Sequence, residues 1–349
     1  MKTARLSYFD FLKGLAIFLV VMGHVLTICI RQIDSALLFK IIGQVHMPIF
    51  FFISGYFTGK TDAVTGKFLF PHIWKRFAQL VVPMILVSTL WIYYYPYSGL
   101  CSPFDSTWSG LWTDLWKNGY WFPLTLFAIC VIYAAAVPLF NFFNQRLVAI
   151  ISIIIAISAA LNTMASLLPE SVVNAASMPF VAMFFPIFIL GVLCRIFPHL
   201  YTRATETSGW FTTALVVTFI VGYYILYPWD FPELPEWIRY YCQVLIHPFV
   251  VIIAVHIAKR ISVKTEGNRL YGLWCYLGRK SLAIYLLHYF FLFPMGVFRA
   301  PLREMNLDIV PTLFLSAICA AIITAVTLGV NYIIGHSPLL SRLLTGSTR

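Results

Sequence analysis

Hydrophobic residues fill long stretches of this chain, and they run continuously instead of alternating with polar residues. Runs of about 20 apolar residues recur along the whole length, and each is long enough to cross about 30 Å of hydrocarbon as a helix. We therefore expect an all-α, polytopic membrane helix bundle. The pattern predicts about ten transmembrane helices, at 8–29, 41–59, 77–97, 120–140, 147–166, 178–197, 209–227, 241–258, 280–298 and 310–334.

Composition and charge support this class. The chain has 349 residues, of which 60% are hydrophobic and 11% are charged, whereas a soluble domain carries about 25% charged residues. With the N-terminus in the cytoplasm, the cytoplasmic segments hold most of the 24 Lys and Arg residues, as the positive-inside rule predicts. We expect both termini to be cytoplasmic, in a multi-pass protein of the cell inner (plasma) membrane.

The net charge of +11 is then mainly a consequence of topology. It favours contact with the lipid bilayer's anionic headgroups or with an anionic cytoplasmic cofactor, and it does not indicate nucleic acid. Nothing divides the sequence, so we expect a single domain over 1–349. The seven cysteines form no CxxC pair; we expect them to be small packing residues and predict no metal site.

Two outer loops, 98–119 and 228–240, are rich in aromatic and acidic residues. Tryptophan and tyrosine commonly lie at the headgroup level, so an interfacial belt is one interpretation. The other is a platform that binds a sugar acceptor with ring faces and carboxylates. The sequence alone leaves both open.

The first apolar run contains three polar residues, Asp10, Lys13 and His24. A helix turns by about 100° per residue, which places all three on one face, with Lys13 and His24 about 16 Å apart along the axis. Exposing such groups to lipid is costly, so we expect this face to line a polar interior. A buried ion pair beside a hydrogen-bonded histidine, with no chemistry, is the alternative.

Further polar groups fall at similar depths in other predicted spans. His46 lies in the outer half of the second span, and Tyr285 and His288 share a face of the ninth. Lys75 and Arg76 stand at the inner mouth of the third span. Three intramembrane histidines with a lysine and an aspartate favour a functional pathway over purely structural roles.

Four stretches, in order, resemble the acyltransferase-3 family of integral membrane acyltransferases. Asp10, Lys13, Gly14 and His24 are similar to its D-x-L-R-G-x-A-I-x-x-V-x-x-H segment. "HMPIFFFISGYF" resembles M-P-x-F-F-x-x-S-G-Y, "YWFPLTLF" resembles W-F-L-x-x-L, and "LGRKSLAIYLLH" resembles G-x-x-S-x-x-I-Y-L-x-H. The family more often has arginine at the position of Lys13. Its third-span motif usually holds two arginines, where this chain has Arg76 with Lys75 and His72.

The resemblance implies an O-acyltransferase that takes an acyl group, most often acetyl, from acyl-CoA and gives it to a hydroxyl of a glycan or lipid-linked sugar. We expect no permanently bound cofactor, with acetyl-CoA as the acyl donor. His24 would act as general base or as a covalent acyl carrier, and Asp10 would pair with Lys13. The groups assigned to orienting the base or stabilising the oxyanion are His46, Tyr285 and His288, and those assigned to the donor phosphates are Lys13, Lys75, Arg76 and Arg279.

Two other classes fit a many-helix protein with intramembrane ionisable residues. A secondary transporter or flippase would use them along a transport pathway. A sensory or scaffold membrane protein would use the fold without chemistry. The resemblance favours the enzyme over both.

Overall fold

The structure is a computed structural model that describes residues 6–30, 33–59, 66–94, 119–144, 146–226, 235–265, 267–292 and 309–346. Within these ranges the chain is helical apart from short turns, and it contains no strand. The all-α prediction is therefore confirmed. Most of the two outer loops that were considered as a sugar platform, 98–118 and 228–234, lies outside the described residues.

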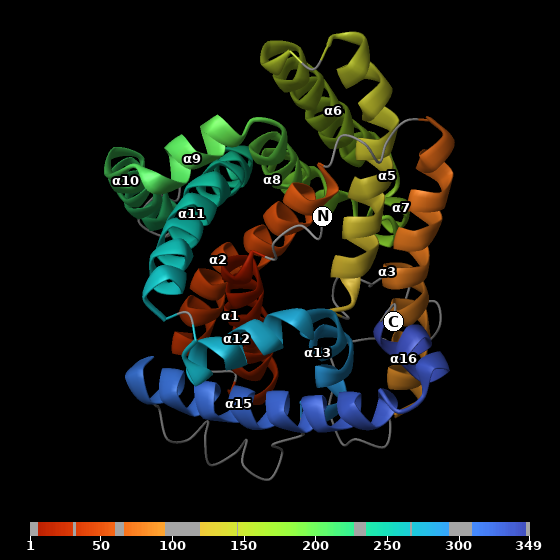
Figure 1. Cartoon of the computed structure of the whole chain (residues 1–349), viewed down its shortest axis with the longest axis vertical. Helices are drawn as coiled ribbons and strands as arrows, with labels where there is room; N and C mark the ends of the chain where they lie inside the picture. Colours follow the sequence, from red (N-terminus) through yellow and green to blue (C-terminus); the bar gives the residue numbers. More distant parts are fainter. Residues whose placement is uncertain are drawn as a thin grey trace. The chain divides into compact units, whose positions relative to one another are not determined.

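Helices of very different length make up the fold (Figure 1). In chain order they are α1 (Ser7–His24), the π-helix η1 (Val25–Ile30), α2 (Ile33–Thr58), α3 (Gly66–Tyr94), α5 (Trp121–Phe142), α6 (Leu147–Leu167), α7 (Glu170–Ala175), α8 (Met178–Ile196), α9 (Pro198–Glu206), α10 (Ser208–Leu226), α11 (Glu236–Thr265), α12 (Arg269–Arg279), α13 (Ser281–Leu287), the 3-10 helix η5 (His288–Phe291), α15 (Ile309–Ile334) and α16 (Pro338–Thr345).

Eight of the described segments are long and apolar enough to cross a membrane. They coincide with eight of the predicted spans, which shows a membrane helix protein. The other two predicted spans, 209–227 and 280–298, correspond to shorter apolar helices at Ser208–Gly222 and Ser281–Phe291. The count of ten spans and the cytoplasmic placement of both termini therefore stay predictions.

The chain divides into two compact units. Unit 1 comprises Met1–Ile53 and Phe197–Asn331, and unit 2 comprises Ser54–Ile196 and Tyr332–Arg349. Helices α2 and α15 each contribute to both units. The prediction of a single domain over 1–349 stays a prediction, and the two units are described separately below.

Unit 1 is built around the packing of α1 along α12 and α11 (Figure 1). Glycines allow the closest approach, because a Cβ on Gly14 would collide with the Trp274 carbonyl oxygen and one on Gly278 would collide with the Asp10 carbonyl oxygen. Small residues at membrane helix crossings bring backbones together in this way. This contact ties α1 to α12, and the chain continues from α12 directly into α13 and η5.

A hydroxyl network fixes the start of α1 to the same neighbours. The Tyr271 hydroxyl of α12 lies 2.9 Å from Ser262 Oγ of α11 and 3.1 Å from Ser7 Oγ of α1. Burial raises the pKa of Tyr271, so its hydroxyl keeps its proton and remains a hydrogen-bond donor at neutral pH. The first turn of α1 is thereby held against both helices.

Unit 2 shows a similar close contact between the end of α2 and α8. A Cβ on Gly55 would collide with the carbonyl oxygen of Phe188. At the start of α5, the Trp121 ring stacks on Phe180 of α8, with centroids 4.0 Å apart. Helices α3 and α16 also pack together within this unit.

Four of the six cysteines in the described ranges are buried: Cys29, Cys130, Cys275 and Cys319. They lie in η1, α5, α12 and α15, respectively. Their burial fits the packing role expected from the sequence.

We predict that Gly278→Ala destabilises the protein, because the new methyl group overlaps backbone that cannot rotate away. Overpacking of this kind costs about 1–3 kcal/mol. Gly272→Ala is the matched control on the same helix, since no other described part of the chain comes within 4 Å of its Cβ position. Thermal unfolding in detergent should show a lower Tm for Gly278→Ala and an unchanged or slightly higher Tm for Gly272→Ala. Equal midpoints for the two variants would contradict the close α1–α12 contact.

Candidate functional site

His24 is the last residue of α1, and the chain passes from it directly into the π-helix η1. A π-helical turn is rare and is often found at functional sites. Thr27 of this turn hydrogen-bonds through Oγ1 to the carbonyl oxygens of Gly23, at 3.1 Å, and His24, at 3.3 Å. The backbone around His24 is thus irregular but retains hydrogen-bond partners.

Three aromatic side chains meet at His24 in unit 1. The Tyr289 hydroxyl lies 3.0 Å from His24 Nε2 and 3.2 Å from Nδ1. The ring centroids of His24 and His288 are 5.3 Å apart, and those of His288 and Tyr289 are 4.5 Å apart. His46 is also close enough for its charge to interact with that of His24. We call His24, His46, His288 and Tyr289 the imidazole cluster.

Two of these histidines have their tautomer set by backbone carbonyl groups. His288 Nδ1 lies 2.7 Å from the Tyr285 carbonyl oxygen, and His46 Nδ1 lies 2.6 Å from that of Ile42. A carbonyl oxygen only accepts, so each Nδ1 carries the hydrogen and each neutral ring presents Nε2 as a lone pair. His288 is fully buried, and its Nε2 has no hydrogen-bond partner among the described residues.

Asp10 and Lys13 form the ion pair that their spacing predicts. Lys13 Nζ lies 2.9 Å from Asp10 Oδ1, and the Asp10 side chain is 7% exposed, against 23% for Lys13. The positive charge of Lys13 is therefore already balanced within α1. Arg279, at the end of α12, is exposed and has its guanidinium 5.8 Å from the centroid of the Tyr276 ring.

Lys75 and Arg76 belong to unit 2. Lys75 is exposed, while Arg76 donates from Nη2 to Thr58 Oγ1 at 3.2 Å. Arg195 of α8 lies over the ring of Tyr56, 5.5 Å from its centroid. Two arginines from different helices therefore contact the last turn of α2.

The structure places His288 and Tyr289 beside His24, and the catalytic roles assigned from the sequence stay predictions. The sequence singled out Tyr285, whose ring centroid lies 6.1 Å from that of His288, but Tyr289 supplies the phenol that contacts His24. The 3-10 helix η5 begins at His288, and the next residue, Tyr289, contacts His24. A helical wheel drawn through position 288 misses that change. The contact of Arg195 with the end of α2 also could not be predicted from the sequence, because the two segments are far apart along the chain.

The cluster can hold and move a proton. It offers at least two imidazole lone pairs, from His46 and His288, and one phenolic hydroxyl beside His24. In the part of the chain that the structure describes, no three His, Cys, Asp or Glu side chains gather as metal ligands would. The arrangement suits acid–base chemistry on a hydroxyl group in a water-poor interior.

Comparison with known proteins adds independent information. A family model described as "Acyltransferase domain" matches residues 6–330. The Nodulation protein NolL of Mesorhizobium japonicum is 40% identical over 86 residues, covering 24% of this chain and 22% of that protein. The Nodulation protein NolL of Sinorhizobium fredii is 30% identical over 197 residues, covering 53% of this chain and 47% of that protein. The matches thus cover less than half of either relative. No solved structure matches this chain.

Proposed function

Because the chain belongs to the acyltransferase-3 family, we propose that it is a membrane O-acyltransferase. In this proposal it moves an acyl group, typically acetyl, from acyl-CoA to a hydroxyl of a cell-surface or lipid-linked glycan. The observation that carries the proposal is the imidazole cluster, in which Tyr289 lies 3.0 Å from His24 Nε2 and His288 keeps a buried nitrogen without a described partner.

In the proposed reaction, His24 is the only group that carries a proton between the acceptor and the leaving thiolate. His24 takes the proton of the acceptor hydroxyl while the hydroxyl oxygen attacks the thioester carbonyl carbon. The carbon–sulfur bond then breaks, and the leaving CoA thiolate receives the proton from His24. General base catalysis of this kind contributes about 10²–10⁴-fold to the rate.

Tyr289 is the proposed positioning residue. Its hydroxyl can donate to an imidazole lone pair or accept from an imidazole N–H, so it holds the His24 ring in either protonation state. His46 and His288 present lone pairs and not donors while neutral. They therefore suit acceptance of a substrate hydrogen bond better than stabilisation of an oxyanion, which requires a donor.

The donor's phosphates need positive charge, and each unit by itself contains candidate basic residues. Arg279 in unit 1 and Lys75 in unit 2 are exposed, and Arg76 and Arg195 contact the end of α2. Arginine binds phosphate with two parallel hydrogen bonds. Arg195 is thus a candidate for the second arginine that the third-span motif lacks. Lys13 is less suited, since Asp10 balances its charge.

The proposed acceptor class rests on the family resemblance and on one of the two interpretations of the outer loops. The segments 98–119 and 228–240 combine tryptophan, tyrosine and carboxylates, which suits binding of sugar rings and hydroxyls. These segments are expected on the membrane face opposite the basic loops, so the acyl group would cross the bilayer interior on its way from donor to acceptor. The excess of Lys and Arg in the predicted cytoplasmic segments supports this placement of the loops.

We predict that His24→Ala lowers acyl transfer by about 100-fold or more, because the proton of the acceptor hydroxyl loses its base. The assay incubates purified protein with radiolabelled acetyl-CoA and membrane glycan acceptors and measures label in the glycan. His336→Ala, at an exposed histidine beyond α15, is the control. Transfer by His24→Ala at the rate of the control would end the assignment. Uptake or release of the acceptor without thioester consumption would favour a transporter instead.

We predict that Tyr289→Phe lowers kcat about tenfold and leaves KM for acyl-CoA unchanged, because one hydrogen bond of about 1.4 kcal/mol that orients His24 is lost. Tyr332→Phe is the control, since that phenol is 69% exposed on α15. A simple loss of packing would lower Tm and the yield of folded protein instead. Unchanged kcat in Tyr289→Phe would show that the contact with His24 has no role in turnover.

A further inference from the structure

Unit 1 contains a cavity of about 480 Å³ at the opposite end of α1 from His24. Its lining comes from Tyr8 of α1, from Thr205 and Glu206 of α9, and from six residues of α11: His256, Lys259, Arg260, Ser262, Val263 and Lys264. We call it the α9 pocket. None of the residues assigned above to catalysis or donor binding lines it. Its volume lies in the range of small-molecule sites, about 300–1,000 Å³.

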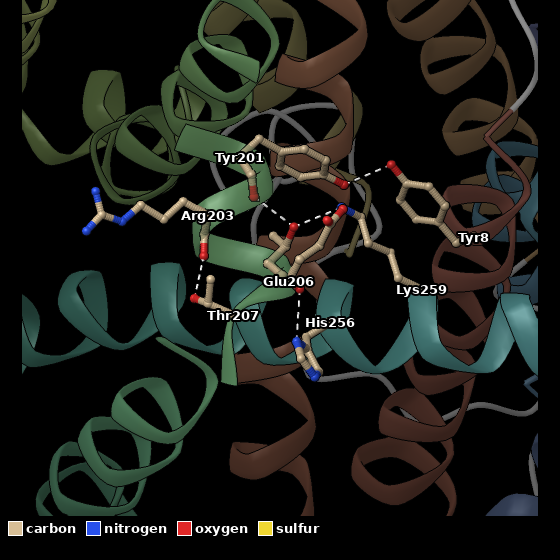
Figure 2. Close-up of polar contacts among 8 residues, drawn as sticks. Tyr8, Tyr201, Arg203, Glu206, Thr207, His256 and Lys259 are labelled. Atoms are coloured by element: carbon tan, nitrogen blue, oxygen red, sulfur yellow. Dashed lines mark hydrogen bonds and ion pairs between the residues drawn. The ribbon is translucent and has the colours of Figure 1, made fainter. Parts of the chain in front are cut away.

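Lys259 is a fixed positive charge in the wall of this pocket (Figure 2). Its Nζ lies 2.9 Å from Thr205 Oγ1 and 2.9 Å from Glu206 Oε1. The ammonium group also lies 4.1 Å from the centroid of the Tyr201 ring, in a cation–π contact. The Tyr201 hydroxyl is in turn 2.8 Å from that of Tyr8. The three contacting groups leave Lys259 little freedom to move, and Glu206 balances its charge.

Arg260 and Lys264 carry two further positive charges that line the pocket. Both are exposed, and neither forms an ion pair or hydrogen bond with any residue in the described ranges. Their spacing of four residues places them on one face of α11, where like charges repel. Because Glu206 already pairs with Lys259, the pocket has an excess of positive charge.

His256 is the buried polar residue on that same face, one turn before Arg260. Its Nδ1 lies 2.9 Å from the Thr205 carbonyl oxygen, and its ring stacks on Phe211 with centroids 4.4 Å apart. Both contacts hold the ring rigidly, so this side of the pocket is preformed. A preformed wall beside two unpaired cations lowers the cost of ordering a ligand.

We propose that the α9 pocket binds a phosphate ester. Arg260 and Lys264 contact the phosphate oxygens, and Lys259, paired with Glu206, forms a rigid part of the wall behind them. Guanidinium and ammonium groups form strong charge-assisted hydrogen bonds to phosphate. The ligand cancels the repulsion along α11, so the occupied protein is more stable than the empty one.

Two sources can supply this chemistry. The cations occupy the last turns of the candidate span Tyr240–Thr265, which is where a phospholipid headgroup meets a membrane helix. A soluble phosphate ester such as a nucleotide reaches the same cavity from the aqueous side. The first source makes the pocket a lipid site, and the second makes it a site for a soluble effector.

The test compares three purified full-length proteins: wild type, Arg260→Gln/Lys264→Gln, and Arg269→Gln/Arg342→Gln. The third removes two exposed cations outside the pocket and is the matched control. Native mass spectrometry after solubilisation from mixed vesicles measures retained phosphatidylglycerol against phosphatidylcholine. Equilibrium binding of radiolabelled glycerol 3-phosphate, a phosphate ester that is not part of CoA, measures the soluble source in detergent. Neither readout depends on acyl transfer, so failure of the pocket proposal can be told apart from failure of the proposed function.

We expect wild type and control to bind one of the two probes, and the pocket variant to bind it about tenfold or more weakly, since two charge-assisted contacts are lost. Retained phosphatidylglycerol assigns the pocket to lipid, and bound glycerol 3-phosphate assigns it to a soluble ester. If the double variant does not fold, Arg260→Gln and Lys264→Gln are compared singly with Arg269→Gln. Absence of binding in wild type, or equal binding in pocket and control variants, overturns the proposal.

Discussion

The close backbone contact between α1 and α12 is the constraint on which the candidate catalytic site depends. Gly14 and Gly278 let the two helices approach until a methyl group on either would overlap a carbonyl oxygen of the partner. Because α12 runs straight into α13 and η5, this contact also sets where His288 and Tyr289 lie relative to the end of α1. A shift of one helix along the other would separate His24 from the Tyr289 hydroxyl, now 3.0 Å from its Nε2.

Hydrogen bonding then gives the cluster its chemical character. In a membrane interior, a polar side chain without a partner is costly. His46 and His288 satisfy one ring nitrogen each on a carbonyl of their own helix, one turn earlier. That arrangement leaves the second nitrogen of each ring as a lone pair, which is why the cluster suits proton acceptance. The Asp10–Lys13 pair, 2.9 Å apart, has a different role: it neutralises charge where α1 meets α12.

The sequence predicted a large part of this account. Continuous apolar runs identified the helices, and helical spacing placed Asp10, Lys13 and His24 on one face. The resemblance pointed to Gly14 and Gly55 without explaining them; the structure shows both at helix crossings. Hydrophobic periodicity does not predict departures from a regular helix. The π-turn after His24 and the 3-10 turn at His288 are two such departures, and they bring Tyr289 to the site. The α9 pocket was also missed, because its residues come from three segments far apart in the sequence.

A cryo-electron microscopy map of the protein in lipid nanodiscs tests the central claim most directly. The measurement is the orientation of the His24 ring and its distance from the Tyr289 hydroxyl. The account predicts that the ring faces the protein interior within hydrogen-bonding distance of Tyr289, with α1 and α12 in backbone contact at Gly14 and Gly278. A His24 ring that points into the lipid tails, or helices held apart by intervening side chains at the two glycines, would contradict it.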